Sequence, residues 1–234
     1  MIQREKTNTP KKRILSACVR MFIERGFRAT TMQDIIKEAD VSAGTFQNIF
    51  RTKDGVLSEL AEFMFSNQFG IARGLAAGIS RPAGVYAVET AIQFAITEEN
   101  ENLREIYIEA YTVPQLSEYI YQMTSTELKK VFGTYNPDWA DSDFYEAEIG
   151  TAGMMRAYMA RPCDKYFTLS KKTERFLRMA FTVYHVPSEE AEVILEKLRT
   201  LDIAKTANAV MQSLFSTLEM TFDFKFSKPT AQWQ

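Results

Sequence analysis

Residues 13–57 read RILSACVRMFIERGFRATTMQDIIKEADVSAGTFQNIFRTKDGVL. From position 11 to position 25 the apolar residues recur every three or four positions, as they do on one face of a helix. Gly26 follows directly, and glycine is the residue that most often ends a helix at its C-terminus. This part of the chain therefore predicts an amphipathic first helix with one buried face.

Two shorter helices are predicted after Gly26. Thr31 stands three residues before Asp34, which is the pattern of an N-terminal cap. A tight turn is expected at Asp40-Val41, and Ser42 can cap a third helix that runs through Phe50. Three short helices with a tight turn between the second and the third predict a helix-turn-helix unit.

The third helix is predicted to have two unlike faces. Its inner face is expected to carry Phe46, Ile49 and Phe50. The outer face is small or polar and consists of Ala43, Gly44, Gln47 and Asn48. Small residues let a helix approach the major groove of DNA, and side-chain amides pair with adenine. The starts of the second and third helices can also offer backbone N–H groups to phosphates.

The same stretch resembles the DNA-binding domain of the tetracycline-repressor (TetR) family over about a fifth of the chain. The similar motifs are Ile14-Leu15 with Ala17 and Phe22, Gly26-Phe27, Thr30-Thr31 with Ile35 and Ala39, and Val41-Ser42-x-Gly44-Thr45-Phe46 with Phe50, Lys53 and Leu57. The resemblance implies a homodimeric transcriptional regulator, usually a repressor. Such a protein is released from a palindromic operator by a small ligand that binds its C-terminal domain.

The resemblance also implies DNA contacts at particular positions, mostly to phosphates. Carried over residue by residue, these positions are Thr31, Ser42, Gly44, Thr45 and Lys53. The sequence departs from the family where bases are chosen. Ala43 stands where the family often has lysine, and 47–49 read Gln-Asn-Ile where it usually has aromatic residues or histidine. Gln47 and Asn48 are therefore expected to supply base contacts, unless they only solvate an exposed face.

Composition sets the class of the whole chain. The 234 residues are 46% hydrophobic, enough to bury a sizeable core. Residues 1–55 carry 11 Lys/Arg against 6 Asp/Glu, while the remainder is acidic, which suits contact with nucleic acid through one small module. The two cysteines lie far apart, and neither a membrane-length apolar run nor a signal-peptide stretch is seen. A soluble, cytoplasmic protein is expected.

Helical stretches account for the rest of the chain, and an all-α fold is predicted. They are expected at 56–79, 83–97, 102–112, 115–132, 142–160, 170–185, 188–199 and 203–222. The predicted domains are 1–55, a helix-turn-helix domain with a basic arm, and 56–234, a ligand-binding and dimerisation domain. Gly70, Gly74 and Gly78 are expected to let a neighbouring helix pack closely. The last helix carries the apolar stripe Ile203, Ala207, Val210, Leu214 and Leu218, which is long enough to pair with a helix of a second subunit.

A cavity for a small, largely apolar ligand is expected among the methionine, phenylalanine and tyrosine side chains of the C-terminal part. The polar candidates for ligand contact are Tyr107, Tyr111, Arg156, Tyr158 and His185. Each of them also fits an ordinary core or surface position. Arg156 lies in an apolar stretch, and a buried arginine there would need an internal acid or an anionic ligand.

Two other classes of function compete with the regulator. An enzyme is disfavoured, because the sequence has no phosphate-binding glycine loop, no histidine-based triad and no metal-ligand spacing, and its only histidine is His185. No cofactor and no metal are expected. A DNA-bound adaptor that acts through protein partners, without a small ligand, would share the same fold. A ligand-sized cavity separates the regulator from the adaptor, and paired titratable groups in that cavity would make turnover worth testing.

Overall fold

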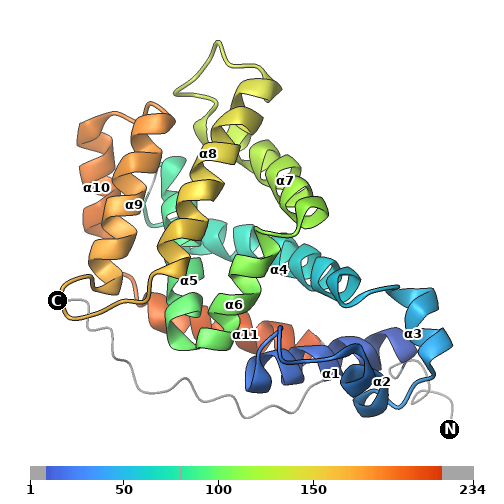
Figure 1. Ribbon diagram of the computed structural model, residues 1–234. Helices are drawn as coiled ribbons and strands as arrows, with labels where there is room; N and C mark the ends of the chain where they lie inside the picture. The colour runs from blue at the N-terminus through green and yellow to red at the C-terminus, as the bar shows by residue number, and fades with distance from the viewer. Residues whose placement is uncertain (1–8, 80, 218–234) are drawn as a thin grey trace, which may run out of the picture.

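The protein is a set of α-helices joined by short loops (Figure 1). The computed structural model describes residues 9–79 and 81–217, without the side chains of residues 63–68, 214 and 217. Within these ranges it contains eleven helices and no strand, which confirms the all-α prediction. The helices are α1 (Pro10–Arg25), α2 (Met32–Glu38), α3 (Ala43–Ile49), α4 (Lys53–Ala76), α5 (Ala83–Glu99), α6 (Glu101–Ala110), α7 (Pro114–Phe132), α8 (Asp141–Ala160), α9 (Leu169–Val183), α10 (Ser188–Leu198) and α11 (Ile203–Thr217). In the described part of the chain, no helix has the length and apolar character needed to cross a membrane.

Helices α1 to α3 form a small unit at the N-terminal end of the chain (Figure 1). Its core contains Phe22 and Phe46, which are fully buried, and the ring of Phe22 meets that of Phe27 edge-on at 5.0 Å. Each of the three helices begins at a side-chain cap, supplied by Thr9, Thr31 and Ser42. The predicted helix-turn-helix therefore forms from local capping signals and one shared apolar core.

Helix α5 is the centre of the larger C-terminal part. Fourteen of its 17 residues are buried. Every other helix from α4 to α11 packs against it, so α5 is enclosed on all sides. A helix that is apolar around its whole circumference is stable only in such an interior.

Helix α6 attaches the N-terminal unit to the C-terminal part, α4 to α11, which we call the body. The Asn102 side-chain amide donates to the carbonyl oxygen of Ile23 at 2.8 Å. Arg28 Nε donates to Glu109 Oε1 at 2.6 Å. Gly26 lies at the contact with φ +90°, and a Cβ there would stand 2.7 Å from the Glu105 carboxylate. Glycine is therefore required both by the backbone and by the close approach of α6.

Two packing predictions are wrong. A Cβ at Gly70 or at Gly74 would meet nothing within 4 Å, and at Gly78 only a backbone oxygen of its own turn, so no helix of the described residues packs closely on these glycines. The apolar stripe of α11 is buried within its own chain, because α11 lies against α5 and α4. The Leu214 side chain and Leu218 lie outside the described residues.

The predicted boundaries of the helices from α4 to α10 hold within three residues, and α11 is described only as far as Thr217. The domain boundary predicted after residue 55 falls in the first turn of α4, which begins at Lys53. Helix α4 is therefore shared between the N-terminal unit and the body, and the division into 1–55 and 56–234 stays a prediction.

A buried lysine fastens the end of α5 to α8 and α9. The Lys172 side chain is fully buried, and its ammonium donates to the Glu98 carboxylate and to the carbonyl oxygen of Arg161. Glu98 also accepts from the backbone N–H of Cys163 at 2.9 Å and pairs with Arg104 at 3.3 Å. Such a charge is tolerated inside a protein only when it is paired and hydrogen-bonded.

We expect Lys172→Met to lower the free energy of unfolding by about 3 kcal/mol or more, since it removes one partner of a buried ion pair. The matched control is Lys171→Met, because Lys171 is the exposed neighbour on the same helix. We expect the control to change stability by about 0.5 kcal/mol or less. Urea denaturation of both variants measures the difference, and equal midpoints would show that the buried pair contributes nothing.

Candidate functional site

The exposed face of α3 carries the residues that were predicted to meet DNA. Gln47 and Asn48 are exposed, while Phe46 and Phe50 hold the opposite side in the core. Ser42, Ala43 and Gly44 are exposed at the start of the helix, and Thr45 is half-buried beside them. The predicted separation into a small polar outer face and an apolar inner face is confirmed for these residues.

Ile49 departs from the prediction. It was expected on the inner face, but 36% of its surface is exposed. Helix α3 is short and packs on α1 and α2, so Phe46 and Phe50, four residues apart, take up the whole contact. Ile49 is left as an apolar side chain on the exposed side, next to Asn48.

The caps of α2 and α3 hold their backbones rigidly. Thr31 Oγ1 accepts from the N–H of Asp34 at 3.2 Å, and the Asp34 carboxylate accepts from the backbone N–H of Thr31 at 3.0 Å, which completes the predicted capping box. The Thr31 hydroxyl also donates to this carboxylate at 2.6 Å. These hydrogen bonds from Thr31 hold the pKa of Asp34 below its usual value. Ser42 Oγ accepts from the N–H of Thr45 at 3.0 Å. Between the two helices Asp40 adopts φ 49°, as the predicted tight turn requires.

Lys53 has partners within the protein. Its ammonium donates to the carbonyl oxygens of Phe27 at 2.7 Å and Thr30 at 3.0 Å, and it lies 4.1 Å from the centre of the Phe27 ring. It therefore fixes the loop between α1 and α2 to the start of α4. An ammonium has three N–H donors, so one remains for the phosphate contact, which stays a prediction.

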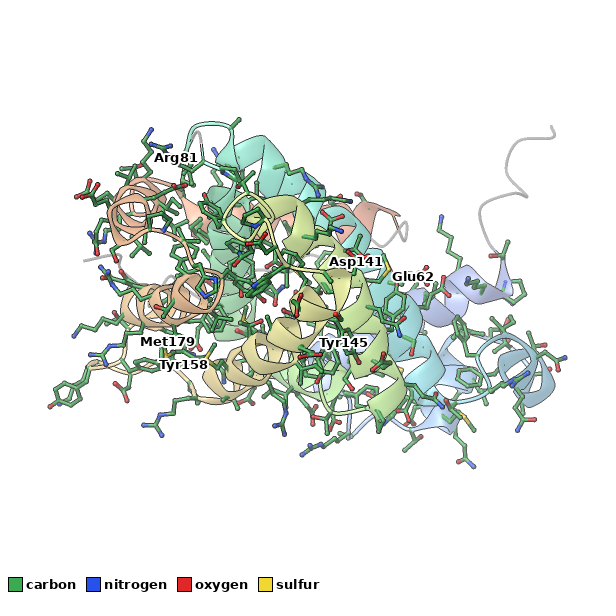
Figure 2. The ribbon with its side chains drawn as sticks, turned by 90° about the horizontal axis from the view of Figure 1, so that it is seen from above. Glu62, Arg81, Asp141, Tyr145, Tyr158 and Met179 are labelled. Atoms are coloured by element: carbon green, nitrogen blue, oxygen red, sulfur yellow. The ribbon has the colours of Figure 1, made fainter. Side chains whose placement is uncertain are left out.

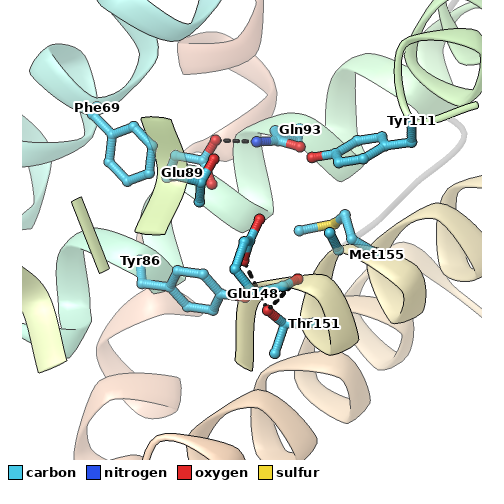
Figure 3. Close-up of a pocket in the computed structure, with 10 residues that line it drawn as sticks. Phe69, Tyr86, Glu89, Gln93, Tyr111, Glu148, Thr151 and Met155 are labelled. Atoms are coloured by element: carbon cyan, nitrogen blue, oxygen red, sulfur yellow. Dashed lines mark hydrogen bonds between the residues drawn. The ribbon is translucent and has the colours of Figure 1, made fainter. Parts of the chain in front are cut away.

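A second candidate site is a cavity enclosed by α4, α5, α7 and α8 and by the end of α6 (Figure 3). The volume that the centre of a water molecule can occupy is about 20 Å³. The whole space between the lining atoms, including solvent at the mouth of the cavity, is about 290 Å³. The lining residues are Phe69, Tyr86, Glu89, Gln93, Tyr111, Thr124, Glu148, Thr151, Ala152 and Met155. The lining is more polar than the prediction of a largely apolar ligand implied.

Only Tyr111 of the five predicted ligand contacts lines this cavity. Arg156 is exposed and donates to Thr112 Oγ1 at 3.3 Å, so the expectation of a buried arginine is wrong. His185 lies at the turn after α9, where its Nδ1 is 2.6 Å from Asn136 Oδ1. Tyr158 packs beside the rings of buried phenylalanines, and Tyr107 is buried outside the cavity. None of these four lines the cavity.

Sequence reasoning missed the two glutamates of the cavity. Glu89 is 3% exposed on α5 and Glu148 is 4% exposed on α8, and in Figure 3 their carboxyl groups point into the same space. One signal was available, since Glu89 and Gln93 stand four residues apart in the otherwise apolar α5. A charge there had to face a polar space inside the body.

Burial dominates the electrostatics of this pair. It raises the pKa of Glu89 to about 7, although a hydrogen bond from the Gln93 amide opposes the shift. Burial likewise raises the pKa of Glu148 to about 8, opposed by a 2.8 Å hydrogen bond from Thr151 and reinforced by the charge of Glu89. Both carboxyl groups therefore hold protons near neutral pH far more than an exposed glutamate does.

Two further polar atoms of the lining lack partners. Within the described part of the chain, nothing hydrogen-bonds to Gln93 Oε1 or to Thr124 Oγ1, although both side chains are more than nine-tenths buried. The lining residues that the structure describes include no lysine, arginine or histidine. Searched over the same described residues, the protein shows no cluster of side chains that could hold a metal ion.

The comparison with known proteins supports the reading of α1 to α4. Residues 14–60 match the model of the bacterial regulatory proteins of the tetR family. The chain is 24% identical over 122 residues to the uncharacterized HTH-type transcriptional regulator YerO of Bacillus subtilis (strain 168), which covers 50% of this chain and 42% of YerO. It is 37% identical over 60 residues to the uncharacterized HTH-type transcriptional regulator YvkB of the same organism, which covers 26% of this chain and 32% of YvkB. The match therefore spans less than half the length of each relative.

A solved structure shares the fold beyond the N-terminal unit. RolR, in complex with the ligand resorcinol, aligns over 82% of this chain and 96% of its own with a TM-score of 0.59. The sequences are 20% identical, so the likeness shows the fold.

We expect Glu148→Gln to stabilise the protein in a pH-dependent way. Because the folded pKa is raised to about 8, the wild type loses stability as the pH rises from about 5 through about 8, whereas glutamine does not titrate. The variant should exceed the wild type by on the order of a few kcal/mol at high pH and by little at about pH 5. Thermal denaturation across this range measures it. Glu146→Gln, an exposed position on the same helix, is the control, and parallel pH profiles for Glu148→Gln and wild type would contradict the account.

Proposed function

We propose that the chain is a member of the tetR family of bacterial regulatory proteins, and that it acts as a transcriptional repressor released from double-stranded DNA by a small ligand. The observation that carries the proposal is the exposed face of α3. Gln47 and Asn48 point outward from a helix that is capped by Ser42 and begins with the small residues Ala43 and Gly44. This geometry suits entry into the major groove.

We assign base contacts to three neighbouring side chains. Gln47 and Asn48 have amides that can form paired hydrogen bonds with adenine. Ile49, exposed beside them, can contact a thymine methyl group. The residues at the helix starts, Thr31 and Ser42 among them, are assigned to phosphates.

The cavity is the candidate ligand site of the repressor, whereas an adaptor that works without a ligand needs no such site. It is lined by Phe69 of α4, which continues from the N-terminal unit, and by Tyr111 at the end of α6, which is docked on α1. A ligand in this space touches both connections to the DNA-binding unit. The carboxyl pair also makes a turnover assay worthwhile, but only the regulator explains the exposed face of α3 in the same chain.

We propose that the protein acts as a homodimer through α8 and α9. The stripe of α11 is buried within its own chain, whereas Ile149 on α8 is 44% exposed and Met179 on α9 is 37% exposed. A Cβ at Gly150 or Gly153 would meet nothing within 4 Å, so a partner helix can approach closely. Figure 2 shows Met179 and the α8 residue Tyr158 on one side of the molecule, where the two helices contact each other.

Selection of bound DNA from a random pool tests the proposal directly. We expect a palindrome whose half-sites are about 10 bp apart, or a multiple of that, because two copies of α3 must meet two equivalent grooves. Sedimentation of the same protein should give a dimer at micromolar concentration. Asymmetric selected sites, or a monomer, would contradict the proposal.

Variants of α3 then separate base contacts from other contacts. We expect Gln47→Ala and Asn48→Ala each to change the preference among selected sites by about 1–3 kcal/mol, as for a lost paired contact to a base. Lys53→Ala should weaken all sites alike, because its contacts order a loop or meet a phosphate. Gln212→Ala, exposed on α11, serves as the control. If only Lys53→Ala alters base preference, the assignment is reversed.

A further inference from the structure

The carboxyl pair of the cavity has no counter-charge in the described structure. Glu89 and Glu148 come from different helices and point into one space (Figure 3). The described lining contains no cationic side chain, and no lysine, arginine or histidine acts on the pKa of either glutamate. A buried carboxylate is stable only next to a cation or several hydrogen-bond donors.

The cavity also contains polar side-chain atoms without a hydrogen-bond partner among the described residues. Gln93 gives its amide N–H to Glu89, and its own oxygen is left without a partner. Thr124 Oγ1 is unpartnered on the α7 side. Buried polar atoms of this kind are unfavourable unless something binds to them. Gln93 Oε1 can only accept a hydrogen bond, whereas the Thr124 hydroxyl can accept or donate one.

We propose that the cavity binds a compact organic cation that carries several N–H donors, an amidinium or a protonated amine, between Glu89 and Glu148. The cation replaces the missing counter-charge, and its remaining N–H groups reach Gln93 Oε1 and Thr124 Oγ1. Phe69, Tyr86 and Met155 surround its apolar part, and aromatic faces attract cations as well. The role of this cation as the effector rests on the proposed function, whereas its binding does not.

Proton release accompanies binding. The glutamates hold protons near neutral pH and must ionise to pair with the cation, so protons pass from the carboxyl groups to solvent and affinity rises with pH. The other titratable groups that face the pair are Tyr86 on α5, Tyr111 after α6 and Tyr184 after α9. Burial raises the pKa of all three phenols, which stay neutral. The described residues that α4 and α7 contribute, Phe69 and Thr124, do not titrate.

The test compares benzamidine, a cation, with benzamide, its neutral isostere, by isothermal titration calorimetry of the full chain. We expect benzamidine to bind about tenfold tighter or more, as for charge-assisted hydrogen bonds to a buried acid. Its affinity should rise between about pH 6 and about pH 9, across the pKa values of the pair. The heat in buffers of different ionisation enthalpy should report proton release.

Variants locate the site. Glu89→Gln and Glu148→Gln keep the side-chain shape and remove the charge, so each should lose the preference for benzamidine, while Glu146→Gln, exposed on α8, should retain it. Circular dichroism verifies that each variant is folded. Equal binding of the two probes, unchanged binding by both glutamine variants, or no benzamidine binding in the millimolar range would each overturn the proposal.

Operator affinity separates this inference from the proposed function. If benzamidine binds through both glutamates and weakens binding to the selected DNA, both are supported. Binding through both glutamates with unchanged DNA affinity would overturn the effector role and leave the cation site in place. Release of DNA by benzamide alone would overturn the cation inference and leave a ligand-responsive repressor.

Discussion

The enclosure of α5 by seven other helices is the constraint on which the rest of the structure depends. With 14 of 17 residues buried, α5 has no solvent-facing side on which polar groups can be placed. Glu89 and Gln93 are therefore forced into the interior, and packing leaves a cavity where Glu148 of α8 meets them. The same burial raises the pKa of both glutamates, so the architecture and the chemistry of the cavity have one physical cause.

Two elements connect this cavity to the N-terminal unit of α1 to α3. Helix α4 runs from Lys53, which holds the loop between α1 and α2, to Phe69 in the cavity wall. Helix α6 runs from the contact of Asn102 with α1 to Tyr111 in the same wall. We infer that a ligand acts through both helices, and that it shifts the position of α3 only as far as it binds one arrangement better than the other.

What could be predicted from the sequence was decided by local interactions. The caps at Thr31 and Ser42 and the period of α1 depend on residues three or four positions apart, and the structure has them as predicted. The errors concern faces whose partner is distant in sequence. The covering of the α11 stripe by α5 and the exposure of Ile49 and Arg156 depend on tertiary packing that no periodicity specifies. The pairing of Glu89 with Glu148 belongs to the same class.

We infer that the cavity and the exposed face of α3 are two sites of one linked equilibrium. The most direct measurement is the affinity of benzamidine for the free protein and for the protein saturated with its selected DNA. Reciprocity requires the ligand to bind the DNA complex more weakly, by the same factor by which it weakens DNA binding. We expect such a loss of affinity, with a tenfold change corresponding to about 1.4 kcal/mol. Equal affinities for the free and the DNA-bound protein would contradict it.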